Sequence, residues 1–396
     1  MVRSINLCTY EIDIPELAVE EIRSQLSGFQ LGTNTAGIVM CDPEFLQSGV
    51  YAAICKELPF PIAGTTTMNQ AVNMRDTTEV GILMLTILVL TSDDVSFSVG
   101  LSEKISPTTD SDVTSSLKKP YAEAAAVLNG KPELIFIFAP LFDEVAGDLF
   151  VDAFGEVAPN VPVFGSLAVS DRIEFDNCQT LFCGQSYFDK IAFIIVSGNV
   201  SPKFLFTVVK SDNKLPHSGK ITKSKGHVIM EINGMNAAEY FTNIGIVRDG
   251  KLDAGMQFVA FVTEMESRPD NDGVPIVRAL VYIDENGYGV CRGNMEANTI
   301  FTVTNPLKED VLESTSALMD RILKEQYNTA IIFSCIIRRI VLGTDFLAEA
   351  ELIAEKLKNT DNIFFSYSGG EICPSSLKNG NVTNRFHNYS AVACLL

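Results

Sequence analysis

The sequence predicts an α/β fold (mixed α+β) in which extended mixed sheets are flanked by helices and contain three related β-α-β-β units. Of the 396 residues, 46% are hydrophobic and 20% are charged, which provides for large cores and little disorder. Several apolar runs lack polar alternation and therefore indicate strands covered on both faces. The same order of elements occurs three times, with a glycine-containing turn after the second strand of each unit.

The predicted elements of the three units are as follows. The first unit has a strand at 36–42, a helix at 43–58 and strands at 61–67 and 81–91. The second has a strand at 133–139, a helix at 143–157 and strands at 162–168 and 190–197. The third has a strand at 329–335, a helix at 345–358 and strands at 363–369 and 389–395.

A different pattern separates the second unit from the third. Strands are predicted at 203–210, 227–232, 274–284, 287–292 and 298–303, with helices at 236–243 and 307–326. Ser/Thr/Pro-rich stretches at 106–116 and 266–275 are predicted to be loops. Because Gly, Asn, Ser and Pro cluster at 198–202, we predict domains at 1–200 and 201–396.

Charge and cysteine content restrict the class of partner. A net charge of −19 argues against nucleic acid or an anionic membrane, because both require a basic face. The one basic stretch, at 210–225, is predicted to be a solvated hairpin loop, and the longest apolar run, at 80–90, is too short to span a bilayer. With no signal peptide evident and nine scattered cysteines lacking a CxxC pair, a reducing cytoplasm is expected. Three histidines without metal spacing predict no metal site.

Polar clusters follow the strands of the third unit. They are Phe333-Ser-Cys-Ile-Ile-Arg338-Arg339, Phe365-Ser-Tyr-Ser-Gly-Gly-Glu371 and Arg385-Phe-His-Asn-Tyr389. A strand–helix–strand unit places its strands side by side, so these clusters can meet at the strand ends where α/β proteins hold ligands.

These clusters carry a family resemblance. In order along the chain, the matching pieces are Ile232-Asn-Gly-Met-Asn-Ala-Ala-Glu-Tyr240, Pro275-Ile-Val-Arg278, Phe333-Ser-Cys-Ile-Ile-Arg338, Tyr367-Ser-Gly-Gly-Glu371-Ile and Phe386-His-Asn-Tyr-Ser390. The ordered set resembles the FIST domain (F-box and intracellular signal transduction), and the N-terminal half resembles the family's N-terminal module. The turn Ala63-Gly-Thr-Thr-Thr67 lacks the acidic residue found near this turn in the family.

The resemblance implies a small-ligand sensory protein. Amino acids or similar small carboxylates are the suspected ligands, and the signal would pass to a separate protein. A subset of the family resembles haem-binding nitric-oxide sensors, so haem held through His387 is an alternative. No other cofactor is expected.

Arg338 and Glu371 are the first candidate ligand-binding residues. A guanidinium binds a carboxylate through two parallel hydrogen bonds, and a carboxylate accepts an ammonium group. Arg338 could instead form an internal ion pair with Glu371, Glu349 or Glu351. Continued strand alternation would allow only one of Arg338 and Arg339 to face a shared site.

Other polar residues could orient a ligand. Tyr367, Ser368 and Asn388 are candidates, although the adjacent glycines could simply permit a bulge or a positive-φ turn. Arg278 could line a second wall of the pocket or lie exposed on a sheet face.

His387 and Cys335 have further possible roles. His387 could be a haem ligand, a general base or a histidine fixed by hydrogen bonds. In a cysteine-hydrolase alternative, Cys335 is the nucleophile, His387 the base and Glu371 the orienting group, but an inert buried thiol is the expected state. We therefore predict a non-catalytic protein. The C-terminal strand, 391–396, is expected inside its own sheet, although a homodimer interface is possible.

Overall fold

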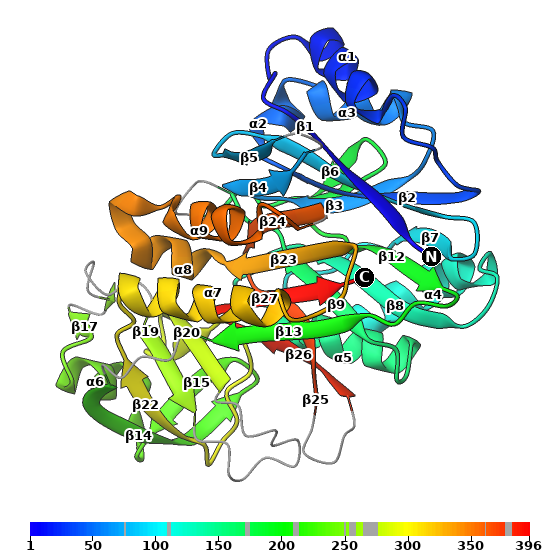
Figure 1. The fold of residues 1–396 in the computed structure, drawn as a ribbon. Helices are drawn as coiled ribbons and strands as arrows, with labels where there is room; N and C mark the ends of the chain where they lie inside the picture. Colours follow the sequence, from blue (N-terminus) through cyan, green and yellow to red (C-terminus); the bar gives the residue numbers. More distant parts are fainter. Residues whose placement is uncertain are drawn as a thin grey trace.

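The computed structural model describes residues 1–74, 77–108, 112–170, 175–208, 214–248, 251–252, 259–263, 276–360, 362–376 and 382–396. Mixed sheets are flanked by helices, which confirms the predicted fold class (Figure 1). The first unit lies at the top of the view, and a separate sheet lies at the lower left.

The first two units have equivalent elements. Unit 1 contains β1 (Arg3–Thr9), α1 (Pro15–Leu26), β2 (Asn34–Cys41), α2 (Glu44–Gln47), α3 (Val50–Glu57), β3 (Ile62–Thr66), β4 (Gln70–Asn73), β5 (Thr78–Gly81) and β6 (Leu85–Ser92). Unit 2 contains β7 (Ser96–Leu101), α4 (Val113–Ala126), β8 (Pro132–Ala139), α5 (Gly147–Val157), β9 (Val163–Leu167), β10 (Thr180–Phe182), β11 (Gln185–Tyr187) and β12 (Ala192–Ser197).

Unit 3 has the same plan with an inserted sheet after its first strand. It contains β13 (Lys203–Val208), α7 (Lys308–Ile322), β23 (Thr329–Cys335), α8 (Ile336–Leu342), a short 3-10 turn (Gly343–Asp345), α9 (Ala348–Leu357), β24 (Asn362–Ser368), β25 (Glu371–Ser376), β26 (Val382–His387) and β27 (Ser390–Leu395). The insertion contains β14 (Lys214–Lys225), β15 (Val228–Ile232), β16 (Met235–Asn236), α6 (Ala237–Asn243), β17 (Val247–Arg248), β18 (Lys251–Leu252), β19 (Val259–Thr263), β20 (Ile276–Ile283), β21 (Gly289–Cys291) and β22 (Ile300–Thr304).

Strand pairing confirms that the three units are related. In each unit, the strands on either side of a helical segment are parallel: β2 with β3, β8 with β9, and β23 with β24. The last strand of each unit, β6, β12 or β27, is antiparallel to the first of that pair. Strand order and direction therefore agree in all three units.

The units exchange hairpins in a cycle. Hairpin β4–β5 of unit 1 extends the sheet of unit 3, hairpin β10–β11 of unit 2 extends that of unit 1, and hairpin β25–β26 of unit 3 extends that of unit 2. Each six-stranded sheet therefore contains strands from two units, and the two halves of the chain share sheets.

The inner faces of the three sheets form one central core. Ala36 of unit 1, Phe136 of unit 2 and Phe333 of unit 3 belong to the same buried cluster. The helices cover the outer faces and form separate clusters with them. Strand β27 lies between β13 and β23 and is buried throughout, so the C-terminal strand is inside its own sheet, as predicted.

Three local predictions need correction or fall outside the described residues. Residues 214–225 form strand β14, not a hairpin loop, because β15 and β22 pair with it. The predicted loop at 106–116 ends where α4 begins, since the Asp112 side chain accepts a hydrogen bond from Ser115 N at 2.9 Å. Residues 109–111, 210–213 and the predicted loop at 266–275 lie outside the described part of the chain.

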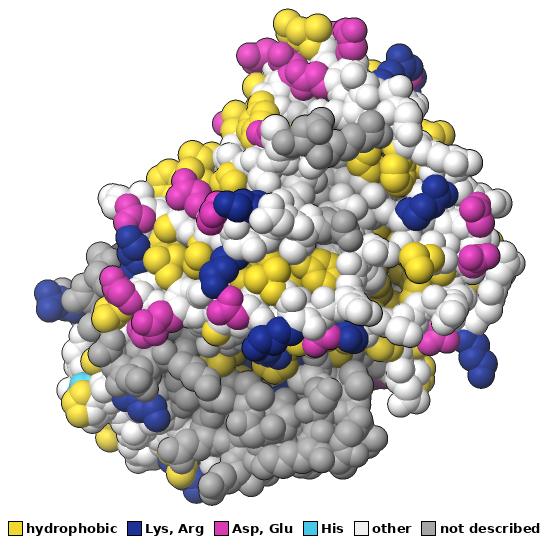
Figure 2. Space-filling view, viewed as in Figure 1, with side chains coloured by type: hydrophobic (Ala, Val, Ile, Leu, Met, Phe, Trp, Pro, Cys, Tyr) yellow, Lys and Arg dark blue, Asp and Glu magenta, His cyan; other side chains and the backbone are white. Residues whose placement is uncertain are grey.

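Surface charges are mixed on the face shown in Figure 2, where Lys and Arg side chains lie among Asp and Glu side chains. Among the described helices, none is long and apolar enough to cross a membrane.

Candidate functional site

Polar side chains form a layer at one end of the central core. They lie two residues from apolar side chains of that core, on the same strand faces, and therefore point into the same interior. This central polar layer consists of three cross-strand pairs: Thr65 with Thr180, Ser166 with Glu371, and Ser366 with Gln70. Each pair joins β3, β9 or β24, the second strand of the parallel pair in its unit, to an exchanged hairpin. The three pairs therefore occupy equivalent positions in the three sheets.

The turns that follow the second strands hold the units together beside this layer. Equivalent carbonyl groups accept a hydrogen bond from the next unit in the cycle: Thr66 O from Val169 N at 3.1 Å, Leu167 O from Gly369 N at 2.9 Å, and Tyr367 O from Thr67 Oγ1 at 2.6 Å. These three hydrogen bonds join each unit to the next at its turn.

Glu371 is the ionisable member of the layer. Its side chain is fully buried, and its two carboxyl oxygens accept hydrogen bonds of 2.6 Å from Ser368 Oγ and Ser390 Oγ. Burial raises the pKa of Glu371 to about 8, although both serine hydrogen bonds lower it. Among the described residues, no cation forms an ion pair with it.

Three hydroxyls of the layer lack hydrogen-bond partners. Ser166 Oγ, Ser366 Oγ and Thr180 Oγ1 are buried and bond to no described protein atom. In contrast, Gln70 Nε2 donates to Met84 O at 2.6 Å. Buried polar groups are normally satisfied by protein, solvent or ligand. The layer therefore has hydroxyl groups that remain able to donate and accept hydrogen bonds.

Arg338 lies in an internal ion pair, one of the alternatives kept open above. It lies on helix α8 and not on a continued strand, so the alternation expected for Arg338 and Arg339 is wrong. Both side chains of the pair are fully buried, and Arg338 Nη2 is 2.7 Å from Glu349 Oε1. Further partners of Arg338 are Ser314, Thr315, Ser334 and the Val311 carbonyl.

Tyr367 and Cys335 are buried beside these groups. The Tyr367 hydroxyl donates to Glu349 Oε2 at 3.0 Å, which makes it part of the ion-pair network. Burial, followed by the nearby Glu371 carboxylate, raises the pKa of Cys335 well above its usual range. This environment favours an inert thiol over the thiolate that a cysteine nucleophile requires.

His387 and Asn388 lie near the end of β26. The His387 ring centroid is 4.8 Å from that of Phe206, and its Nε2 lies 3.1 Å from Cys373 O. Asn388 Nδ2 donates to His387 O at 3.1 Å, while its buried Oδ1 has no hydrogen-bond partner in the described structure. A haem-ligand role for His387 stays a prediction.

Arg278 connects the inserted sheet to unit 2. It is 2% exposed and contacts Asp148 Oδ1 of α5 at 3.2 Å and Phe386 O at 3.3 Å, so the alternative of an exposed position is wrong. Arg292 forms a second connection, to Asp143 at 2.6 Å. These contacts tie Arg278 to Asp148 and Phe386, and its place in a second wall of the pocket stays a prediction.

Close packing explains the glycine pair at the end of β24. A Cβ atom on Gly369 would lie 2.6 Å from Ala168 O, and one on Gly370 would lie 2.5 Å from the Phe386 ring. Neither glycine has a positive φ, so the close approach of Ala168 O and of the Phe386 ring, not a left-handed turn, requires them.

Ser368 and Glu371 stand out in the sequence, whereas Ser166, Ser366 and Thr180 do not. A single hydroxyl within an apolar strand is a weak signal, whereas alignment of the three units would have placed these positions together. Within the described chain, no three His, Cys, Asp or Glu side chains are grouped to hold a metal ion.

Comparison with known protein families gives two adjacent matches. The FIST N domain matches residues 35–235, and the FIST C domain matches residues 237–374. The chain therefore belongs to the FIST family, whose domains are generally thought to be small-ligand sensory or signal-transduction domains. A comparison with curated proteins found no match. The two matched regions meet near residue 236, whereas the division at residue 200 stays a prediction.

Proposed function

We propose that this FIST protein is a non-catalytic receptor for an amino acid or a similar small carboxylate and signals to a separate protein. The observation that carries the proposal is Glu371, a buried carboxyl without a cationic partner in the described structure, next to the unpartnered hydroxyl of Ser166. An isolated buried charge is costly, so a carboxyl in this position is stabilised as an ion when a cation joins it.

The ligand's ammonium group would bind at Glu371. The Ser166, Ser366 and Thr180 hydroxyls would supply further acceptors for its N–H groups. Arg338 already has Glu349 as its partner, so holding the ligand's carboxylate would require Arg338 to share that bond. Glu371 therefore carries more of the proposed recognition than Arg338.

Proton release would accompany binding. Below pH 8, Glu371 must lose its proton to pair with an ammonium ion, so ligand affinity should rise with pH towards about 8. At pH 7, calorimetry in two buffers that differ in ionisation enthalpy should detect close to one proton released per ligand bound.

Signalling would use the turns between units. The polar layer is closed by hydrogen bonds such as those from Val169 N to Thr66 O and from Gly369 N to Leu167 O. A ligand that favours one arrangement of these turns shifts the population of the states that a partner protein recognises.

A thermal-shift screen tests the proposal. Amino acids, their amines lacking the carboxylate and their acids lacking the amino group should be compared at pH 7 and 8. A ligand at 100 times its dissociation constant should stabilise the fold by about 2.7 kcal/mol. Glu371→Gln should abolish the shift, whereas Glu351→Gln, an exposed change on α9, should preserve it. Equal shifts in wild type and Glu371→Gln would contradict this site.

A further inference from the structure

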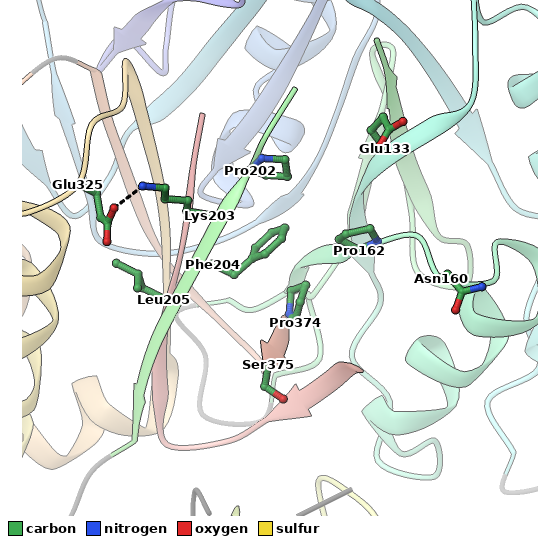
Figure 3. Close-up of a pocket in the computed structure, with 10 residues that line it drawn as sticks. All are labelled: Glu133, Asn160, Pro162, Pro202, Lys203, Phe204, Leu205, Glu325, Pro374 and Ser375. Carbon is green, nitrogen blue, oxygen red and sulfur yellow. Dashed lines mark hydrogen bonds and ion pairs between the residues drawn. The ribbon is translucent and has the colours of Figure 1, made fainter. Parts of the chain in front are cut away.

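A surface cavity of about 610 Å³ lies where the sheet of unit 3 meets the sheet of unit 2. Figure 3 shows Phe204 of β13 between the Lys203–Glu325 ion pair and the prolines Pro162 and Pro374. Its volume falls within the range of small-molecule sites. None of the central polar layer lines this cavity, so it is separate from the site proposed above.

The equivalent junction in unit 1 explains why a cavity forms here. Asn6 occupies the position of Phe204, because it pairs with Leu88 as Phe204 pairs with Cys394. Asn6 Nδ2 closes that junction by donating to Asn73 O at 2.9 Å and Ile363 O at 2.7 Å. Phenylalanine has no polar atom with which to make such bonds.

The neighbouring residue changes in the same direction. Pro374 is the fourth residue of hairpin strand β25, as Asn73 is of β4, so an apolar proline stands where unit 1 has a polar asparagine. The two sheets therefore meet across apolar side chains at this junction. Phe204 stacks on Phe164 with ring centroids 6.2 Å apart, which joins the cavity floor to the central core.

Polar groups at the cavity define the chemistry of an occupant. Ser375 is 2% exposed, and its Oγ has no hydrogen-bond partner in the described structure. The charged lining residues are Lys203, Glu325 and Glu133. Lys203 pairs with Glu325, whereas Glu133 is exposed and forms no ion pair within the described residues.

We propose that this cavity binds a small organic amine with an aromatic or branched apolar body. The apolar part would pack against Phe204 and the prolines, and the Ser375 hydroxyl would bond to a polar atom of the ligand. The ammonium group would lie near Glu133, the charged lining residue that forms no ion pair within the described structure. Because the lining carries one positive and two negative side chains, an amine fits better than a carboxylate.

Three probes with the same body test the inference. Phenethylamine, 2-phenylethanol and phenylacetate share an aromatic ring and differ in charge, so ligand-observed NMR titrations on the full chain separate ring binding from charge. The amine should bind most tightly and phenylacetate most weakly. Binding of none of the three, or equal binding of phenylacetate and the amine, would overturn the proposal.

Variants locate the binding. Glu133→Gln should weaken the amine about two- to fivefold, the range expected for an exposed ion pair, and leave 2-phenylethanol unchanged. Phe204→Leu keeps an apolar side chain at this position and should weaken all three probes. Glu123→Gln, an exposed change on α4, is the matched control and should change nothing. An unchanged amine affinity in Glu133→Gln would also overturn the proposal. Amino-acid binding at Glu371 should persist in these variants, so the two proposals can fail separately.

Discussion

Replacement of Glu371 by glutamine should change the pH dependence of stability. Burial raises the pKa of Glu371 in the folded chain to about 8, whereas an ordinary glutamate has a pKa near 4.5. Between these values the folded state binds more protons than the unfolded state, so the free energy of unfolding falls as pH rises. Glutamine has no proton to lose and retains hydrogen-bonding atoms for Ser368 and Ser390.

The magnitude follows from the two pKa values. At 1.36 kcal/mol per pKa unit, the difference between 4.5 and about 8 corresponds to about 5 kcal/mol. Near pH 4.5, wild type and Glu371→Gln should differ by about 1 kcal/mol or less. At pH 8, the variant should be more stable than wild type by about 4 kcal/mol, with the gap opening progressively between these pH values.

Urea unfolding at several pH values between 4.5 and 8 measures this effect. Circular dichroism is the suitable signal, because the chain contains no tryptophan. Glu351→Gln, an exposed replacement, should follow wild type throughout and controls for the general effect of removing a carboxylate. Parallel curves of unfolding free energy against pH for wild type and Glu371→Gln would show that Glu371 has the same pKa in the folded and the unfolded chain. That result would refute a raised pKa for Glu371 in the folded state.

Three other outcomes follow from burial. Glu349→Gln should lower the free energy of unfolding in urea by about 3–5 kcal/mol, because it leaves Arg338 charged and buried. Arg338→Met combined with Glu349→Leu should recover much of that loss. A double variant as unstable as the single one would contradict this explanation. Iodoacetamide at neutral pH should label exposed Cys183 faster than Cys335, as mass spectrometry would show, and rapid labelling of Cys335 would revive the hydrolase alternative. Deletion of residues 391–396 should abolish soluble expression because β27 is flanked by two strands, whereas a soluble folded product would contradict this role.

The three units could be predicted because their strands are long apolar runs broken by glycine or proline. Helix α8 could not, because Ile336, Ile337, Ile340 and Val341 are residues that favour strands and continue the apolar pattern of β23. The helix places Arg338 beside Glu349, a tertiary contact that the local sequence does not reveal.

The candidate site was predicted in part for a related reason. Glu371 stood out as an acid next to two glycines, but its neighbours in space come from distant strands. Ser166 precedes it by more than two hundred residues and lies opposite it only because hairpin β25–β26 joins the sheet of unit 2. Hairpin exchange leaves no local trace in the sequence. The residues that form a hairpin do not indicate whether it pairs with the sheet of its own unit or with that of another unit.

Hairpin exchange also makes a prediction about the two predicted domains. A fragment of residues 1–200 contains units 1 and 2, yet its β4–β5 hairpin lacks the sheet of unit 3, and its second sheet lacks β25–β26. Both losses expose sheet edges and apolar inner faces, so the fragment should aggregate when expressed alone. Co-expression with residues 201–396 should restore a soluble complex, because each fragment supplies the hairpin that the other needs. Size-exclusion chromatography with circular dichroism measures this outcome. A fragment 1–200 that is monomeric, soluble and cooperatively folded by itself would mean that the exchanged strands are not required to complete either sheet.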